Sequence, residues 1–186
     1  MDITIKRTSL TEVDMLLAIQ KEVFAEDYAL YEDHDSTPVN ETEAKLIENI
    51  ERFFHYTILS DNAIIGAIDI RPLDENRLRL SKFFLRNEFQ NKGLGSKIIK
   101  LMESEFPLIK DWSLYTPYLN KRNHHFYEKL GYIKICEVQV TEKLSYLNMK
   151  KVIRLFIFFF SIRDIFKLVI VTTYSDFSKK IMKICT

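Results

Sequence analysis

Two of the chain's four glycines, Gly93 and Gly95, stand between a strand-like run and a helical run. Residues 77–85 read RLRLSKFFL, where alternation of basic and apolar residues gives way to a continuous apolar stretch, which is typical of a strand buried at its far end. Residues 94–106 carry apolar side chains at helical spacing. The order is therefore strand, glycine-containing loop, helix, and we call residues 89–97, FQNKGLGSK, the glycine loop.

The glycine loop suits a bound anion. The first backbone N–H groups of a helix have no partner within it and carry positive partial charge, so they attract phosphate. Glycine has no Cβ to hold a phosphate away, Gln90 adds an amide donor, and Lys92 and Lys97 add charge. The order Ser96-Lys97 after the last glycine excludes a Walker A loop, and a Rossmann fingerprint needs a third glycine. The alternative is an ordinary turn.

The whole pattern predicts an α+β fold around one mostly antiparallel sheet. The expected strands are residues 2–6, 52–59, 63–70, 77–85, 111–117, 132–140 and 144–150, and the expected helices are residues 8–28, 94–106 and 120–130, with a further helical face in the acidic stretch after the first helix. Ser9 and Glu12 form a capping box for the first helix. The buried face of the second is expected to be Leu94, Ile98, Leu101 and Met102.

Residues 24–44 are acidic and contain neither Lys nor Arg. The acidic residues are Glu26, Asp27, Glu32, Asp33, Asp35, Glu41 and Glu43. Such a run is usually a solvated face of a loop or helix, and we favour that interpretation. The alternative is the rim of a binding site that attracts a cationic amine. Residues 33–35, DHD, have side chains able to bind metal, but three consecutive residues rarely converge on one ion, so no metal is predicted.

Composition argues against two classes of partner. The formal net charge of +1 gives no general attraction to nucleic acid or to an anionic membrane surface. The two cysteines, Cys136 and Cys185, match no metal-ligand spacing. The opening MDITIKRTSL lacks the apolar core of a signal peptide. We therefore expect a cytoplasmic protein that does not bind nucleic acid, and we disfavour a membrane as a partner.

The composition changes at about residue 152, which divides a domain of residues 1–151 from an extension rich in Phe and Ile, residues 152–186. Charged residues interrupt every window of the extension long enough to span a bilayer: Arg154, Arg163, Asp164 and Lys167. Three interpretations stay open: an amphipathic helix packed on the domain or on a second subunit, an interfacial membrane anchor, or a poorly ordered segment. We favour packing or a homodimer, because the apolar side chains would otherwise form a large exposed patch.

Two motifs give the chain a family resemblance. The spacing Gln90-x-x-Gly93-x-Gly95 is similar to the acetyl-CoA loop of the GNAT superfamily of N-acyltransferases. Residues 120–132, NKRNHHFYEKLGY, resemble the second CoA-side segment of that family and stand at the expected distance downstream. The resemblance covers residues 1 to about 150. It implies the GNAT fold, a twisted mixed sheet flanked by helices, whose fourth and fifth strands splay apart to admit the pantetheine arm of acetyl-CoA.

The resemblance also implies which residues bind acetyl-CoA. Backbone groups of one strand would bond the pantetheine amides, the glycine loop would hold the pyrophosphate, and the segment after residue 119 would contact the arm. The residues concerned are Phe83, Phe84, Leu85, Gln90, Asn91, Lys92, Gly93, Leu94, Gly95, Ser96, Asn120 and Asn123. Asn123 stands where the family usually has a small residue, so it could add a polar contact to CoA or to the acceptor.

Tyr127 matches the tyrosine that this family commonly uses as a general acid on the CoA sulfur. A phenol with a pKa of about 10 is a weaker acid than a thiol at about 8.5, so we expect Tyr127 to stabilise the leaving thiolate mainly by a hydrogen bond. The base that deprotonates the amine is left open among five residues, Glu22, Asp27, His34, Asp69 and Glu75, and a chain of water molecules is an alternative to each of them. His124 and His125 are interpreted as packing or surface residues.

The expected activity is transfer of an acetyl group from acetyl-CoA to an amine of a small molecule or a protein, by direct attack in a ternary complex. The acidic segment favours a cationic acceptor, whose identity no motif encodes. The alternative is a non-catalytic acyl-CoA-binding or regulatory module with the same fold. The presence of both the glycine loop and Tyr127 argues for the enzyme.

Overall fold

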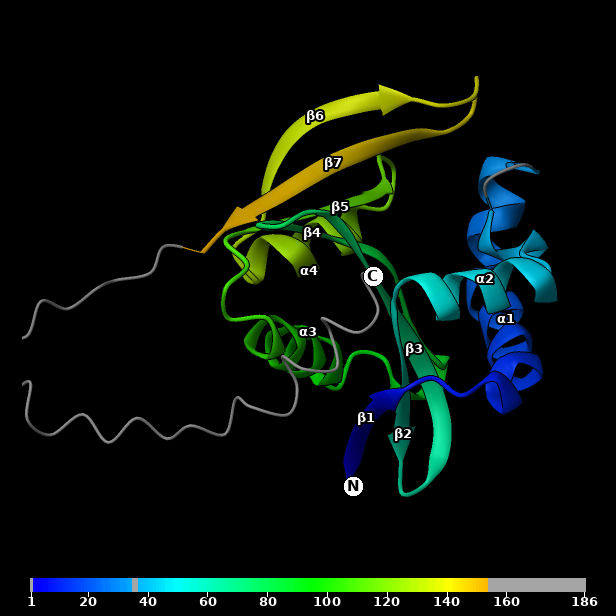
Figure 1. Cartoon of the computed structure of the whole chain (residues 1–186). Coiled ribbons are helices and arrows are strands. Elements are labelled where there is room, and N and C mark those ends of the chain that lie inside the picture. The colour runs from blue at the N-terminus through cyan, green and yellow to red at the C-terminus, as the bar shows by residue number, and fades with distance from the viewer. Residues whose placement is uncertain (1, 35–36, 154–186) are drawn as a thin grey trace, which may run out of the picture. The chain divides into compact units, whose positions relative to one another are not determined.

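The computed structural model of the protein describes residues 2–34 and 37–153. The strands are β1 (Ile3–Arg7), β2 (Phe54–Ser60), β3 (Ala63–Asp74), β4 (Arg77–Leu85), β5 (Asp111–Pro117), β6 (Ile133–Gln139) and β7 (Ser145–Val152). The α-helices are α1 (Val13–Tyr31), α2 (Glu43–Arg52), α3 (Leu94–Glu105) and α4 (Lys121–Lys129). These elements follow the order that the sequence predicts (Figure 1), so the expected α+β fold is confirmed.

A seven-stranded sheet runs through the described residues in the order β1-β2-β3-β4-β5-β7-β6. Neighbouring strands are antiparallel except β4 and β5, which are parallel. These two strands pair only along residues 77–80 and 111–114. β4 then continues to Leu85 and β5 to Pro117 without pairing each other. The splayed strands that the family resemblance implies are therefore present.

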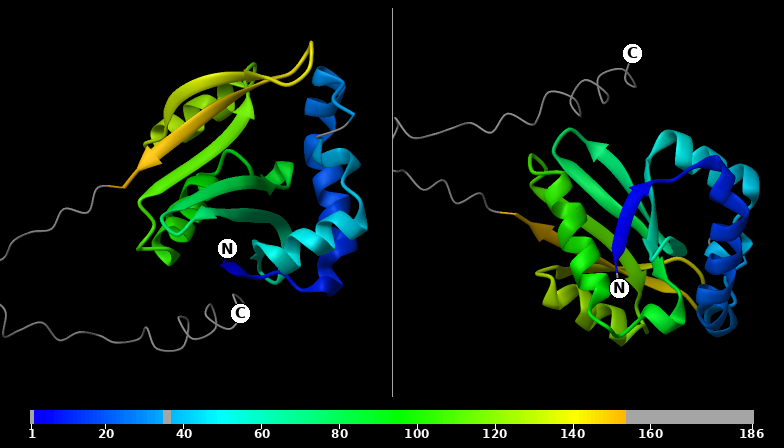
Figure 2. Two further views of the ribbon diagram at one scale, coloured as in Figure 1. Left: turned by 45° about the horizontal axis from the view of Figure 1, so that its top comes forward. Right: turned by 90° about the horizontal axis from the view of Figure 1, so that it is seen from below.

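Helices cover both faces of the sheet. Figure 2 shows α1 and α2, in blue and cyan, on one face and α3, in green, on the other. Leu16 of α1 packs with Phe84 of β4 in one buried cluster. Ile98 of α3 packs with Trp112 of β5 in another. The splayed ends of β4 and β5 thus lie between two packed layers that hold them in place.

The predicted buried face of α3 is wrong at one position. Leu101 is 46% exposed, whereas Ile99 is buried together with Ile98 and Met102. Successive helical residues differ by about 100° around the axis, so a face centred on these three residues turns Leu101 toward solvent. Leu94 is only partly buried against the core.

The helices begin in different ways. The predicted capping box is confirmed: the Ser9 N–H donates to the Glu12 carboxylate at 2.9 Å, at the start of a short 3-10 helix that leads into α1. The Thr42 hydroxyl caps α2, and the Asn120 side chain caps α4. α3 follows Gly93 and has no side-chain cap. The first N–H groups of α3 are therefore available to a ligand.

The last described strand, β7, ends at Val152. The domain boundary after residue 151 stays a prediction, and the interpretations of the extension from residue 154 onward fall outside the described residues. None of the helices within residues 2–34 and 37–153 is long and apolar enough to cross a membrane.

Candidate active site

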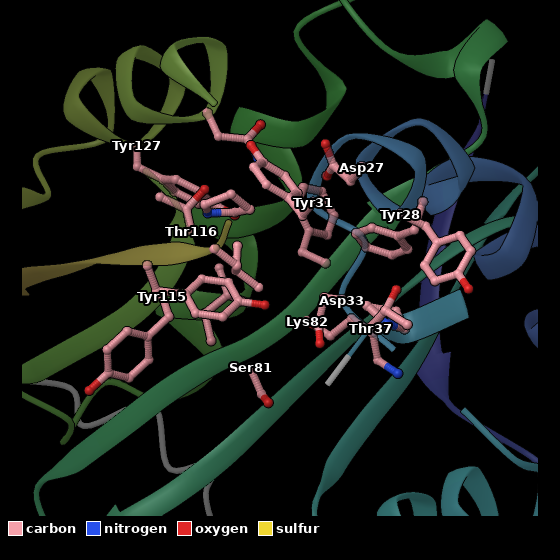
Figure 3. Close-up of a pocket in the computed structure, with 18 residues that line it drawn as sticks. Asp27, Tyr28, Tyr31, Asp33, Thr37, Ser81, Lys82, Tyr115, Thr116 and Tyr127 are labelled. Atoms are coloured by element: carbon pink, nitrogen blue, oxygen red, sulfur yellow. The ribbon is translucent and has the colours of Figure 1, made fainter. Parts of the chain in front are cut away.

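Two cavities lie where β4 and β5 separate. The larger, about 470 Å³, is lined by α1, the end of β4, the glycine loop and α4. The smaller, about 140 Å³, is lined by the second half of α1 and by β4, β5 and the start of β7 (Figure 3). Both depend on the short β4–β5 pairing, because fully paired strands would leave no gap.

The larger cavity gathers nearly all of the residues expected to bind acetyl-CoA. Those that line it are Phe83, Phe84, Leu85, Gln90, Asn91, Gly93, Gly95, Ser96, Asn120 and Asn123, together with Tyr127. Lys92 and Leu94 do not line it. The Lys92 ammonium lies 5.8 Å from the centre of the Phe89 ring, and Leu94 packs against the core.

Two residues of the glycine loop have left-handed backbone conformations. Asn91 and Gly93 both have positive φ, at 57° and 75°, with Lys92 between them outside that region. Alternation of this kind forms a concave nest of N–H groups that binds anions. Ser96 and Gly95 follow in the first turn of α3, where N–H groups have no helical partner. The loop and the helix start are therefore together suited to bind an anion.

Gly95 serves a different purpose from the one that the sequence suggests. A Cβ added there would lie 3.1 Å from the Phe126 ring and 3.4 Å from the Phe83 ring. Glycine at this position therefore lets α3 pack closely against α4 and β4. At Gly93, by contrast, an added Cβ meets nothing within 4 Å, and the requirement comes from the positive φ.

Gln90 and Arg122 tie the glycine loop to its surroundings. The Gln90 amide N–H groups donate to the Leu85 carbonyl at 2.8 Å and to Asn87 at 3.0 Å, so they do not point freely at a phosphate. Arg122 of α4 donates to the Gln90 side chain at 2.8 Å and to Asn91 at 3.2 Å. Sequence reasoning missed Arg122. The signal available was a basic residue two positions after Asn120, inside the second motif.

Asn120 also acts locally. Its side-chain oxygen accepts from the Asn123 N–H at 3.1 Å and caps α4. The same residue lines the larger cavity. The cap fixes the start of α4 and so sets the position of Tyr127 two turns later.

Tyr127 stands at the junction of the two cavities. It lines both, as do Phe24, Asp27, Phe83 and Asn123. Tyr127 is 9% exposed, and burial raises the pKa of its phenol above the ordinary value. Its ring packs in T-shaped contact with a neighbouring Phe and Tyr, and its hydroxyl forms no hydrogen bond to any residue that the structure describes. The phenol is thus held neutral, with its proton available.

Of the five candidates for the general base, Asp27 is the one that lines both cavities. Burial, and secondarily the adjacent Glu26, raise the pKa of Asp27. Glu22 lines only the larger cavity, and exposed His34 bonds a tyrosine of α1. Asp69 is buried in an ion pair with an arginine of its own strand. Glu75 is exposed in the turn between β3 and β4.

A buried ion pair joins the acidic segment to β4. Glu41 accepts from the Lys82 ammonium, from Gln20 at 2.7 Å and from Asn49 at 2.8 Å. Burial alone would raise the pKa of Glu41, but these three donors hold it below the ordinary value. With Asp33 also buried, the acidic segment is not simply the solvated face that we favoured. It packs against the sheet and lines the smaller cavity.

Comparison with known proteins identifies the family. A sequence model of the acetyltransferase (GNAT) family matches residues 16–132. The uncharacterized protein YrkN of Bacillus subtilis is 33% identical over 79 residues, which are 41% of this chain and 43% of that protein, so the match spans less than half of the relative.

Two solved structures share the fold. The PaiA N-acetyltransferase of Thermoplasma acidophilum, in complex with coenzyme A, has a TM-score of 0.66 at 21% identity, covering 82% of this chain and 100% of that one. The ribosomal-protein-S18-alanine N-acetyltransferase of Escherichia coli has a TM-score of 0.65 at 15% identity, covering 82% and 94%. The family model matches more than half of the length of this chain, so the chain belongs to the GNAT family of acetyltransferases.

Proposed function

We propose that the protein transfers the acetyl group of acetyl-CoA to an amine while both substrates are bound. The observation that carries the proposal is the common wall of the two cavities, where Tyr127 stands. A thioester that reaches this wall from the larger cavity would meet an amine held in the smaller one. Family membership supports the acetyl-transfer chemistry.

The larger cavity suits acetyl-CoA in size and in its donors. Its volume of about 470 Å³ lies within the range of about 300–1,000 Å³ that is common for small-molecule sites. The uncapped start of α3 and the positive-φ residues of the glycine loop supply N–H groups for phosphate. Arg122 and Lys129 add positive charge on the facing helix. β4 residues 83–85 pair with β3 but not with β5, so their backbone groups on the β5 side can bond the pantetheine amides.

Tyr127 is proposed to stabilise the departing thiolate. The amine nitrogen forms a bond to the carbonyl carbon of the thioester, and the C–S bond breaks with its electron pair going to sulfur. Because burial keeps the Tyr127 phenol protonated, its O–H can donate to that sulfur as charge develops. Full proton transfer from so weak an acid is unfavourable, so the hydrogen bond carries most of the effect.

The variant Tyr127→Phe tests this role. We expect kcat to fall by about a hundredfold or more, the usual range for acid–base assistance, with acetyl-CoA affinity nearly unchanged. Release of CoA thiol with a panel of amines gives the rate, and calorimetry gives the affinity. Tyr118→Phe is the matched control, because Tyr118 is 38% exposed and lines neither cavity.

The outcomes separate the enzyme from the binding module. An unchanged rate in Tyr127→Phe, with acetyl-CoA still bound, would contradict the role of Tyr127. Wild-type protein that binds acetyl-CoA but releases no thiol with any amine would favour the non-catalytic module. Protein that does not bind acetyl-CoA would refute the proposal as a whole.

The proposal also covers the compartment, the domain boundary and the oligomeric state of the enzyme. The exposed free thiol of Cys136 suits a reducing compartment, and we propose a cytoplasmic enzyme whose domain is residues 1–151. Cell fractionation tests the location. Truncation after Ile153, followed by measurement of oligomeric state and activity, tests whether the extension serves a homodimer.

A further inference from the structure

The smaller cavity combines aromatic rings with carboxylates. Tyr28 and Tyr31 of α1 and Tyr115 of β5 stand around it, and Asp27 and Asp33 contribute the acids (Figure 3). Aromatic faces attract organic cations, and a carboxylate in a partly dry site attracts them more strongly than it does in water. The chemistry of this wall therefore fits a cation.

The basic residue in the same wall does not cancel this preference. Lys82 is the one Lys or Arg among the described residues that line the smaller cavity, and its ammonium is paired with Glu41, which does not line the cavity. Asp27, by contrast, makes no hydrogen bond or ion pair within the described part of the chain. Asp27 is thus a carboxylate of this wall without a partner in the described part of the chain.

A buried hydroxyl gives independent evidence of a ligand. Thr116 on β5 is 2% exposed and lines the smaller cavity. Its Oγ1 atom has no hydrogen-bond partner among the residues that the structure describes. A buried polar atom without a protein partner calls for an explanation, and for an atom in a cavity wall one explanation is a hydrogen bond to a water molecule or a ligand in the cavity.

The cavity also limits the size of its ligand. Its volume is about 140 Å³. A protein cavity of about 150 Å³ holds one benzene molecule, so the smaller cavity admits roughly six non-hydrogen atoms. A compact amine fits entirely, whereas a peptide could insert only its end.

We propose that the smaller cavity binds a compact organic cation with a primary ammonium group, and that the Asp27 carboxylate accepts the proton that this group loses before it attacks. The inference rests on the proposed acetyl transfer and names its acceptor class. Asp27 is placed for this step because it lines both cavities, as Tyr127 does.

The proton balance is complete. The ammonium gives one proton to Asp27, and the neutral nitrogen forms the N–C bond as the C–S bond breaks with its electron pair going to sulfur. The nitrogen then loses a second proton to water, and the thiolate, stabilised by the hydrogen bond from Tyr127 as it forms, takes one proton from water. Asp27 finally releases its proton to water. The products are the acetylated amine, CoA thiol and one proton.

This step predicts a pH dependence. The titratable and charged groups that share the two cavities with Asp27 are Glu22, Glu26, Tyr28, Tyr31, Asp33, Lys82, Tyr115, Arg122, His125, Tyr127, Lys129 and Tyr146. Burial and Glu26 raise the pKa of Asp27, so its carboxylate becomes protonated, and inactive as a base, at a higher pH than an ordinary aspartate. The rate should fall as the pH drops through that raised pKa.

Three amines of similar length test the selectivity: pentylamine, 1,4-diaminobutane and 4-aminobutanoate. We expect kcat/KM for each of the first two to exceed that for 4-aminobutanoate by about tenfold or more, because its carboxylate meets Asp27 and Asp33. A tripeptide with a free N-terminus tests size and should be the poorer acceptor. A preference for 4-aminobutanoate or for the tripeptide would overturn the assignment of the cavity.

Two variants test the residues. Asp27→Asn should lower kcat/KM for pentylamine about a hundredfold near neutral pH and remove the acid limb of the pH profile, with acetyl-CoA affinity retained. Asp14→Asn, an exposed neutralisation on the same helix, should match wild type. Thr116→Val should raise KM for pentylamine about two- to tenfold. A wild-type pH profile in Asp27→Asn would overturn its role and leave acetyl transfer standing.

Direct binding keeps the two proposals separable. Calorimetry with pentylamine in the absence of acetyl-CoA should show binding that Asp27→Asn weakens. If the wild-type protein fails to bind acetyl-CoA yet binds pentylamine in this way, the proposed function fails and the cation site stands. If pentylamine does not bind, or binds both proteins equally, the cation site is refuted.

Discussion

Gly93 tests whether the glycine loop needs a particular backbone conformation or only open space. Its φ of 75° lies in the left-handed region, which costs a residue with a Cβ about 1–2 kcal/mol. An added Cβ meets nothing within 4 Å, so Gly93→Ala introduces strain without a clash. In the absence of ligand the loop of Gly93→Ala can move and relieve this strain. Binding of acetyl-CoA must then return the loop to the strained conformation, which costs affinity. Since about 1.4 kcal/mol is tenfold in affinity, the Kd should rise about five- to thirtyfold.

Two further variants identify the cause. Gly93→Asn carries a larger side chain, but Asn tolerates the left-handed region, so its Kd should stay within about threefold of wild type. Gly131, with a φ of 92° beyond the end of α4, lines neither cavity. Gly131→Ala should therefore lower the stability and leave the Kd unchanged.

Calorimetry with acetyl-CoA and thermal unfolding measure both quantities on the same protein samples. An equal loss of affinity for Gly93→Ala and Gly93→Asn would show that the Cβ itself obstructs the phosphate, as the sequence alone suggests. No loss in either variant would refute the role of the glycine loop in binding the anion.

Three other predictions address stability and binding. Gly66→Ala should reduce the free energy of unfolding in urea by about 1–3 kcal/mol, because its Cβ would lie 2.1 Å from the Phe84 carbonyl oxygen; unchanged stability would contradict this packing. Burial lowers the pKa of His55 to about 3, so as the pH falls the unfolded chain binds a proton before the folded chain does. The free energy of unfolding should therefore fall by up to about 1.4 kcal/mol per pH unit below a pH of about 6.5. His55→Gln should reduce this slope. Arg122→Gln should lower the affinity for acetyl-CoA about tenfold but leave the affinity for S-acetylpantetheine, which lacks phosphate, unchanged. Equal losses of affinity for the two ligands would show that Arg122 does not contact the phosphates.

Features that depend on neighbouring residues were predictable from the sequence. The capping box needs only Ser9 and Glu12, and both of its hydrogen bonds are present. The hairpin between β2 and β3 turns at Asp61 and Asn62, which both adopt positive φ, as the residue types suggest. The splay of β4 and β5 came from the family resemblance, because no local pattern encodes where two strands stop pairing.

Features that join distant segments were not predictable in the same way. Arg122 reaches the glycine loop across a separation of 32 residues, and Lys82 meets Glu41 across 41 residues. The sequence shows each charge but not its partner, so the acidic segment was expected to be mainly solvated. Asp27 was one of five candidates for the base, and only the folded chain distinguishes it, because the two cavities meet beside it.

The short pairing of β4 with β5 has a consequence for hydrogen bonding in the sheet. Residues 81–85 and 115–117 are edge strands that face each other inside the sheet rather than at its border. At the border of a sheet, an unpaired edge allows another chain to add a strand. The gap between these two internal edges has room only for an extended chain. Amides there should exchange rapidly with deuterium until such a chain fills the gap. A substrate arm that carries its own amides would then serve as the missing length of strand.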